Sequence, residues 1–341
     1  MCKTTYDEVK SDYHDQIDKI NEVVKDLQKK LDRQSNNART ITSAQVVQQL
    51  KLSHEPDAIS NLEILNNQPL TTWVDKSGNT SILNKNGIAG TINGEFLRVT
   101  YTNLKNSSYK GNIISKIVVT FSDSKPNSTY ISNPNGGRQQ FLVILKDPAD
   151  GIYHATQLKA AYQYYDSNDR LINFDTNDAW ISINSLNSWS MTGVISEAVK
   201  GGNGTTAYQL DGSSIRVHDD GWAYSDFDNY SEETSAYPEK QADNGTLSGN
   251  GDASTSDGSR GWDYNNSPFF FYGSILYLLK GNKIELEYKN NYSFEKDAYS
   301  DNDNSINNGG AWASVATIIP KTILPKVSYH YSTVTFQNMF K

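Results

Sequence analysis

The fourteen residues from Val217 to Tyr230, VHDDGWAYSDFDNY, carry side chains of the kinds that bind metals and sugars. They combine four aspartates with one histidine, one tryptophan and two tyrosines. Carboxylates bind Ca²⁺, a flat aromatic ring stacks on a sugar, and two facing carboxylates hydrolyse a glycosidic bond. The same composition also suits a polar loop around a buried ring, so four interpretations stand at this point.

Calcium is the metal that this segment would bind, because Ca²⁺ prefers carboxylate and carbonyl oxygens. The ligands that the spacing offers are Asp219, Asp220, Asp226 and Asp228. Aspartates at such positions also cap turns in solvated loops, and that alternative stays open. We expect a structural Ca²⁺ as the cofactor, bound by these four residues.

Catalysis is the weaker interpretation. The chain contains no nucleophile elbow, no P-loop, no dinucleotide-binding glycine motif and no His-Glu-x-x-His motif. Glycoside hydrolysis needs only two carboxylates, and Asp219, Asp226 and Asp263 stand near tryptophans. An exposed aspartate keeps a low pKa and is a poor general acid. We therefore expect a protein that is not an enzyme.

Four of the six tryptophans divide into two groups. Trp180 and Trp312 head apolar runs and are expected to be buried. Trp222 and Trp262 each follow a glycine within segments rich in aspartate and asparagine. We expect these two at the rim of a trough, where an indole face is free to stack on a sugar ring.

The net charge of the chain argues against sequence-independent binding of nucleic acid. The 341 residues contain 31 basic and 39 acidic side chains, for a net charge of −8. The best basic run is formed by Lys105, Lys110 and Lys116, which also suit an ordinary strand edge. Binding of an anionic polymer such as lipoteichoic acid or DNA is the alternative that this run supports.

The first 35 residues predict a helical stalk. Apolar residues recur at spacings of four and three: Tyr13, Ile17, Ile20, Val24, Leu27 and Leu31. This pattern predicts either a short coiled coil that self-associates or one amphipathic helix lying on the body of the protein. Cys2 is the single cysteine, so no disulfide forms within the chain.

Residues 36–72 are expected to be a transition segment with a short helix over Ser43–Leu52. From Trp73 to the end at residue 341 the pattern becomes that of an all-β domain. EFLRVTYT and IELEY alternate apolar and polar residues, which predicts half-buried strands. FLVILK and WASVATII are short apolar runs, which predict strands covered on both faces. The polar stretch 232–260 predicts a long loop.

Four motifs in order carry a resemblance to a known family. They are YQYYDSNDRLINFDTNDAWISINSLN, SSIRVHDDGWAYSDFDNY, WDYNNSPFFFYGSILYLLKGNKIELEY and GGAWASVATIIP. Together they resemble successive segments of the family of glucan-binding protein C and the antigen I/II variable region. These are Gram-positive surface adhesins that include the enterococcal aggregation-substance adhesin domain. The resemblance covers roughly residues 73–323.

The resemblance implies a lectin-like β-supersandwich of two antiparallel sheets on a helical stalk, with loops around a ligand trough and a bound Ca²⁺. It implies a non-enzymatic adhesin on the bacterial surface that binds α-glucan or a host or salivary glycoprotein for adherence, aggregation or biofilm formation. Lipoteichoic acid and DNA are the ligands implied by aggregation substance. A secretion signal and a cell-wall anchor would then lie outside this chain. The ligand-binding residues that we expect are Trp222, Tyr224, Trp262, Asp220 and Tyr264.

Overall fold

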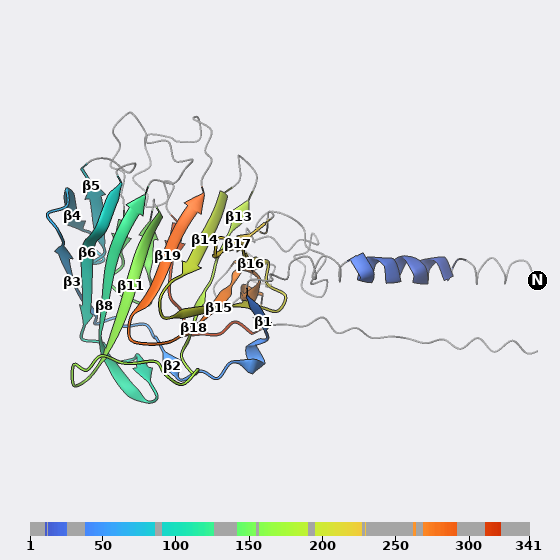
Figure 1. Ribbon diagram of the computed structural model, residues 1–341, viewed down its shortest axis with the longest axis horizontal. Helices are drawn as coiled ribbons and strands as arrows, with labels where there is room; N and C mark the ends of the chain where they lie inside the picture. Colours follow the sequence, from blue (N-terminus) through green and yellow to red (C-terminus); the bar gives the residue numbers. More distant parts are fainter. Residues whose placement is uncertain are drawn as a thin grey trace, which may run out of the picture.

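The protein is built from two layers of β-strands (Figure 1). The computed structural model describes residues 11, 13–25, 38–85, 91–125, 142–154, 157–189, 195–226, 229, 262–263, 269–291 and 311–321. Nearly all strand pairs are antiparallel, and the exception is the pairing of β1 (Arg39–Ile41) with β15 (Thr205–Leu210). The expected all-β sandwich of antiparallel sheets is confirmed.

One layer is a single 11-stranded sheet. Its strands run side by side across Figure 1 from β3 to β17. In spatial order they are β16 (Ile215–Val217), β17 (Trp222–Ser225), β14 (Ile195–Gly201), β19 (Ile284–Asn291), β11 (Gln157–Asp166), β8 (Asn112–Lys125), β6 (Ile92–Thr102) and β3 (Ile59–Ile64). The short strands β13 (Ser188–Trp189), β7 (Ser108–Tyr109) and β2 (Leu50–Lys51) attach beside this path.

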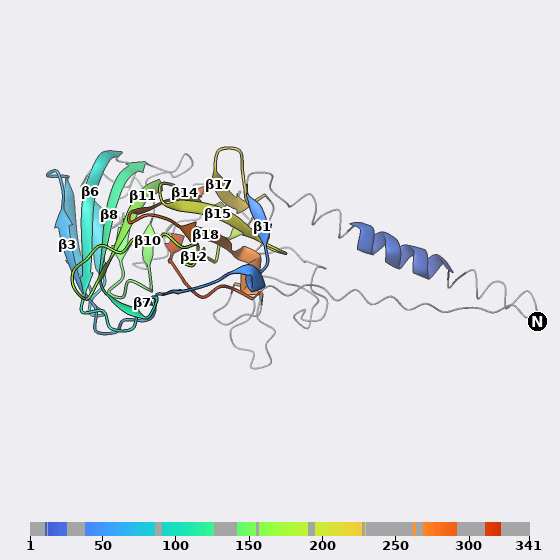
Figure 2. The same cartoon turned by 60° about the horizontal axis from the view of Figure 1, so that its bottom comes forward.

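The second layer is divided into two smaller sheets. The five-stranded sheet has the order β20 (Ala311–Ala313), β10 (Ile152–His154), β9 (Leu142–Ile144), β5 (Thr80–Asn84) and β4 (Leu70–Val74). The four-stranded sheet has the order β1, β15, β18 (Ile275–Leu279) and β12 (Trp180–Ile183). The four-stranded sheet lies at the end of the body opposite β3 (Figure 2).

One hydrophobic core joins the two layers. It contains inward side chains of the large sheet such as Val99 and Val119, of the five-stranded sheet such as Ile82, and of the four-stranded sheet such as Ile181. A second core, which includes Trp180, covers the opposite face of the four-stranded sheet. All five residues of β18 are consequently buried.

The local sequence pattern explains these strands. In β6 the apolar Leu97, Val99 and Tyr101 are buried while the residues between them are partly exposed. The IELEY segment alternates in the same way within β19, where Ile284, Leu286 and Tyr288 are buried. The FLVILK run forms β9, and WASVATII begins with β20. Trp180 is buried as expected, whereas Trp312 is only half-buried.

The expected helix over Ser43–Leu52 is wrong beyond its first turn. A 3₁₀ helix covers Ser43–Gln45 and is capped by the bond from Thr42 N–H to Gln45 Oε1 at 2.8 Å. The chain is then held extended by the Gln48 amide, which donates to the carbonyls of Trp180 and Thr317. The segment expected as a transition thus contributes β1 to β4 to the sheets.

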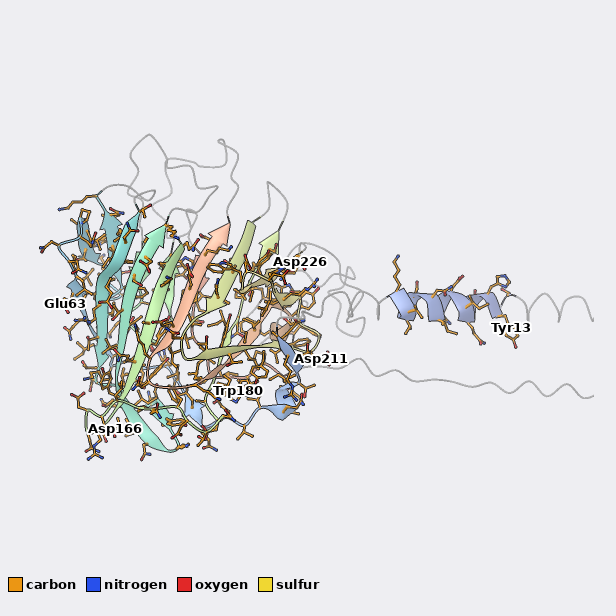
Figure 3. The ribbon with its side chains drawn as sticks, viewed as in Figure 1. Tyr13, Glu63, Asp166, Trp180, Asp211 and Asp226 are labelled. Carbon is orange, nitrogen blue, oxygen red and sulfur yellow. The ribbon has the colours of Figure 1, made fainter. Side chains whose placement is uncertain are left out.

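The helix expected within the first 35 residues is confirmed for residues 13–25. Its apolar side chains Tyr13, Ile17, Ile20 and Val24 are exposed, and the helix is drawn apart from the sandwich in Figure 3. A second 3₁₀ helix, Phe270–Gly273, precedes β18. Within the described residues, no helix has the length and apolar content that crossing a bilayer requires. Leu27, Leu31 and the 232–260 loop lie outside the described residues.

Candidate functional site: an aromatic and lysine patch

The VHDDGWAY stretch forms a hairpin at one edge of the large sheet, from β16 to β17. Two backbone hydrogen bonds close its turn. Gly221 N–H donates to the His218 carbonyl and His218 N–H donates to the Trp222 carbonyl, both at 2.8 Å. Gly221 has φ of +83°, a conformation that costs a glycine little. Asp220 Oδ1 accepts the Trp222 N–H at 3.1 Å. The hairpin is therefore fixed by its own backbone.

The hairpin sends two aromatic rings to the outward face of the sheet. Ala223 packs in the core, so its neighbours Trp222 and Tyr224 point the opposite way. Lys200 is the cross-strand partner of Trp222 and shares that face. Lys289 places its Nζ 4.2 Å from the centroid of the Trp222 ring. We call Trp222, Tyr224, Lys200 and Lys289 the aromatic–lysine patch.

Trp222 is only 7% exposed, which corrects the expectation that its indole face is free at the rim of a trough; Lys289 lies over the ring on the outward face. Such a cation over an indole gains electrostatic attraction from the ring. Lys200 Nζ donates to the Asp220 carbonyl at 2.6 Å and so stands beside the turn. Among the described residues, neither lysine has a carboxylate within the 4.0 Å that defines an ion pair.

A second group supports Tyr224 from the side. The His218 ring stacks on the Tyr224 ring, with centroids 3.8 Å apart and planes at 14°. Asp226 faces both His218 Nε2 at 3.3 Å and Arg216 Nη1 at 3.0 Å, and it lies at the edge of the body (Figure 3). This arrangement holds the tyrosine ring in one orientation, as expected for a structural histidine.

Burial and neighbouring charges shift two pKa values in the patch. Desolvation raises the pKa of Tyr224, and the carboxylates of Asp220 and Asp226 raise it further. Desolvation lowers the pKa of Lys289, and the nearby Lys200 adds to that effect while Asp220 and Glu287 oppose it. The patch therefore combines a neutral phenol with a partly desolvated ammonium group, which suits binding and not proton transfer.

The three described members of the expected calcium cluster, Asp219, Asp220 and Asp226, do not come together as ligands. Asp226 is bound by Arg216, while Asp219 and Asp220 lie in the turn before β17. In the described part of the chain, the only three His, Cys, Asp or Glu side chains with ligand atoms within 4.8 Å of one another are His54, Asp147 and Asp150. Asp228 lies outside the described residues. The aspartates of the hairpin that the structure describes therefore do not form a joint set of calcium ligands.

The residues that fit a calcium ion better lie beside β14. Glu197 Oε2 accepts the Asn187 backbone N–H at 3.1 Å, and Asp263 Oδ2 accepts the Asn187 side-chain N–H at 2.8 Å. Burial raises the pKa of Glu197 to about 8, and Asp263 adds to this by repulsion. Burial also raises the pKa of Asp263. Asn187 Oδ1 is buried and has no hydrogen-bond partner within the described chain. Sequence reasoning missed Glu197, because no acidic cluster surrounds it.

The structure corrects the expected exposure of Trp262. Its ring is fully buried in the second core, and its Nε1–H donates to the Asn229 carbonyl at 2.6 Å. A Cβ added to Gly273 would lie 2.0 Å from the indole, so the ring packs directly on that glycine. Trp262 is a packing residue here and offers no face to a sugar. Tyr264, the other expected ligand-binding residue of this segment, lies outside the described residues.

The lysines of the basic run that was expected to bind anionic polymers form ion pairs with nearby aspartates. Lys105 pairs with Asp57 at 3.1 Å, Lys110 with Asp178 at 3.5 Å, and Lys116 with Asp169. Each lysine therefore already has a carboxylate partner. Lys200 and Lys289, which sequence reasoning did not select, are the lysines that stand beside an aromatic surface.

A small pocket lies between the layers and contains none of the expected site residues. Three tyrosines contribute to its lining. Burial raises the pKa of one of them, Tyr162, to about 12, and its hydroxyl forms a hydrogen bond with the Tyr288 hydroxyl at 3.0 Å. Its lining is Leu52, Tyr101, Ile117, Val119, Phe121, Pro148, Gly151, Ile152, Tyr162, Tyr164, Ala313 and Val315. Most of these residues belong to the core between the layers.

Two stacked layers of mostly antiparallel strands define a β-sandwich protein with aromatic and basic groups on an outward face. The chain belongs to the glucan-binding protein C family, whose model matches residues 33–316. This confirms the resemblance stated from the four motifs. The family is one of non-enzymatic glucan-binding adhesins, so the prediction of a protein without enzymatic activity is also confirmed.

One solved structure supports the fold, and two others are more distantly similar. The glucan-binding protein C of Streptococcus mutans, described as mediating both sucrose-independent and sucrose-dependent adherence, aligns with a TM-score of 0.55 at 20% identity, over 81% of this chain and 78% of that one. The adhesin domain of PrgB from Enterococcus faecalis bound to DNA aligns at 0.47 and 17% identity, over 78% and 72%. The N-terminal domain of the Streptococcus gordonii adhesin Sgo0707 aligns at 0.46 and 7% identity, over 82% and 64%.

Proposed function

We propose that this chain is the ligand-binding part of a surface adhesin that holds an extended polysaccharide of the α-glucan class, or a glycoprotein carrying such a glycan, without altering it. The observation that carries the proposal is the aromatic–lysine patch, in which the half-buried Tyr224 ring lies beside the lysine-covered Trp222 on a hairpin fixed by the large sheet. Rings held by strands lose little conformational freedom when a sugar stacks on them. Family membership supports the ligand class.

Retention on an α-glucan column tests this function. The wild-type chain should be retarded on immobilised dextran, and Tyr224→Ala and Trp222→Ala should be retarded less, on the order of tenfold in affinity for a well-packed aromatic anchor. Asp220→Ala should also weaken retention, because it removes the Oδ1 atom that accepts the Trp222 N–H and fixes the turn. Unchanged melting temperatures are the control. Equal retention of wild type and all three variants would remove the patch from the site.

Binding of an anionic polymer is the second candidate, and the lysines of the patch favour it. Lys200 and Lys289 stand beside the Trp222 ring without an ion-pair partner in the described chain. Their ammonium groups can release counterions from a polyanion such as lipoteichoic acid or DNA. Retention of the polyanion should then fall steeply with salt, whereas dextran retention should not. A flat salt dependence would exclude this candidate.

We also propose a structural Ca²⁺ held by the carboxylates of Glu197 and Asp263, with the Asn187 side-chain amide turned over so that Oδ1, which has no hydrogen-bond partner in the described chain, replaces the NH2 group that now faces both carboxylates. These oxygens come from β14, from the segment before β13 and from the chain that carries Trp262. A bound cation would stabilise two carboxylates whose pKa values burial now raises. Its contribution would be to fasten these three segments together beside the edge of the large sheet.

The place of action that we propose is the outside of a Gram-positive cell, with the stalk helix leading away from the sandwich. In that setting, binding of a polymer shared by neighbouring cells would give adherence, aggregation and biofilm formation. Fractionation of the producing cells tests this placement. Recovery of the chain only from the cell interior would contradict it.

A further inference from the structure

A row of side chains crosses the five-stranded sheet from edge to edge. The register pairs Trp73 with Ser81, Ser81 with Val143, Val143 with Tyr153, and Tyr153 with Trp312. Cross-strand partners point to the same face of a sheet. These five side chains, which we call the aromatic row, therefore lie in line across β4, β5, β9, β10 and β20.

The aromatic row faces away from the core. The residues that alternate with it, including Ile82, Leu142 and Ile152, belong to the core between the layers, whereas no member of the row does. Trp73 is 43% exposed, and Tyr153 and Trp312 are half-buried. Ser81 and Val143 are small and buried between them. The rings at the two ends are therefore the accessible parts of the row.

The geometry of the row suits an extended ligand. Strands in a sheet lie about 4.8 Å apart, so Trp73 and Trp312 are separated by about 19 Å over four strand spacings. The Trp312 indole N–H donates to the Asp150 carbonyl at 2.7 Å, which fixes the orientation of that ring. Rigid rings on strands at this separation would contact one polymer at several of its units, and not a single small molecule.

The charge of this face selects the ligand class. Among the described strand residues that point outward here, none is charged: Thr71, Trp73, Ser81, Leu83, Val143, Tyr153 and Trp312. The outward face of the large sheet, in contrast, carries Lys159, Lys200, Glu285, Glu287 and Lys289. Aromatic faces interspersed with hydroxyls and without charge complement a neutral sugar polymer and offer nothing to a polyanion.

We propose that the aromatic row is a second polysaccharide-binding surface, on the opposite layer from the aromatic–lysine patch, which holds a neutral glucan chain lying across the five strands. The inference rests on the proposed function, because it names a further site for the same class of polymer. With one neutral face and one basic face, the sandwich would hold two polymer chains at once and crosslink them, which a single trough would not do.

Affinity electrophoresis of the full chain in native gels containing dextran tests the inference. Trp73→Ala and Trp312→Ala should each be retarded less than wild type, on the order of tenfold in apparent affinity. Trp73→Tyr should keep most of the retardation because it keeps a flat ring. Tyr165→Ala is the matched control, since Tyr165 points outward from β11 in the other layer, beside Lys116. Thermal melting of every variant reports whether the sheet survives.

The outcomes separate this inference from the proposed function. Retardation that persists in Trp73→Ala and Trp312→Ala but is lost in Trp222→Ala overturns the aromatic row and leaves the proposed function standing. A wild-type chain that dextran does not retard at all overturns both. Sedimentation supplies a further measurement: a dimer that dissociates in Trp73→Ala would show that the row binds a second copy of this chain instead, and would also overturn the inference.

Discussion

Lys289 covers Trp222: its Nζ lies 4.2 Å from the centroid of the indole, on the outward face of the large sheet. The two residues meet because only one strand, β14, lies between β17 and β19. The long Lys289 side chain reaches across it. The same lysine therefore shields the ring from water and supplies the positive charge of the patch.

Replacing Lys289 separates the two candidate ligands. In Lys289→Gln, retention of DNA or lipoteichoic acid should weaken and the slope of log affinity against log salt should fall by about one, because one phosphate contact is lost. Dextran retention should persist, because the ring remains. Chromatography over a salt series measures both. Lys159→Gln is the matched control, since Lys159 points outward from β11 and already pairs with Asp123 at 3.1 Å. Equal effects of both variants would contradict a specific role for Lys289.

Calcium should stabilise the fold through Glu197. A ligand that binds only the folded chain at about 100 times its Kd adds about 2.7 kcal/mol to the free energy of unfolding. Calorimetry with Ca²⁺ and with chelator should show this gain in wild type, and Glu197→Gln should lose it. Glu63→Gln, at an exposed glutamate on β3, is the control. The same melting temperature in Ca²⁺ and chelator would contradict the calcium site.

The pH dependence follows from the raised pKa of Glu197. Folded Glu197 keeps its proton up to about pH 8, whereas the unfolded side chain releases it near 4.5. The folded state binds more protons in this window, so without calcium the free energy of unfolding falls as pH rises. Glu197→Gln should flatten this dependence, and the gain from Ca²⁺ should grow with pH because the ion competes with the proton. A wild-type stability that rises over the same window would contradict this account.

Trp262 should behave as a core residue. Gly273→Ala forces a methyl group against the indole, where the added Cβ would lie 2.0 Å from the ring, and overpacking of this kind costs about 1–3 kcal/mol. Trp262→Ala should cost about 3–5 kcal/mol through the cavity it leaves. Urea unfolding measures both. Gly202→Ala is the control, because the atom it meets first is the Cβ of Glu285 at 3.0 Å at a more exposed position. An unchanged unfolding midpoint in Gly273→Ala would return Trp262 to the list of ligand-binding candidates.

The strands were predictable because their signal is local. Leu97, Val99 and Tyr101 alternate with polar residues within a single strand, and that alternation alone decides which side faces the core. The spacing of apolar residues that predicts the stalk helix is equally local. The family resemblance added the layered architecture, which no single strand encodes.

The site was less predictable because it depends on register between distant strands. Nothing near Trp222 indicates that Lys289 covers its ring, and nothing near Trp262 indicates that Gly273 leaves room for it. Sequence neighbours rich in aspartate suggested exposure for both tryptophans, whereas contacts from other strands determine their burial. The aromatic row has the same origin, since its members extend from Trp73 to Trp312 and only the pairing of five strands brings them into line.

Self-association should occur through the stalk. Tyr13, Ile17, Ile20 and Val24 are 50–65% exposed along one stripe of the helix, so the body of the protein does not cover them. Burying such a stripe against a second copy removes apolar surface from water at about 25 cal/mol per Å². Sedimentation of the full chain should show a concentration-dependent oligomer, and the double variant Ile17→Lys with Ile20→Lys should be monomeric. Glu22→Lys changes charge away from the stripe and should leave association intact. A wild-type chain that sediments as a monomer at all concentrations would contradict self-association through the stalk.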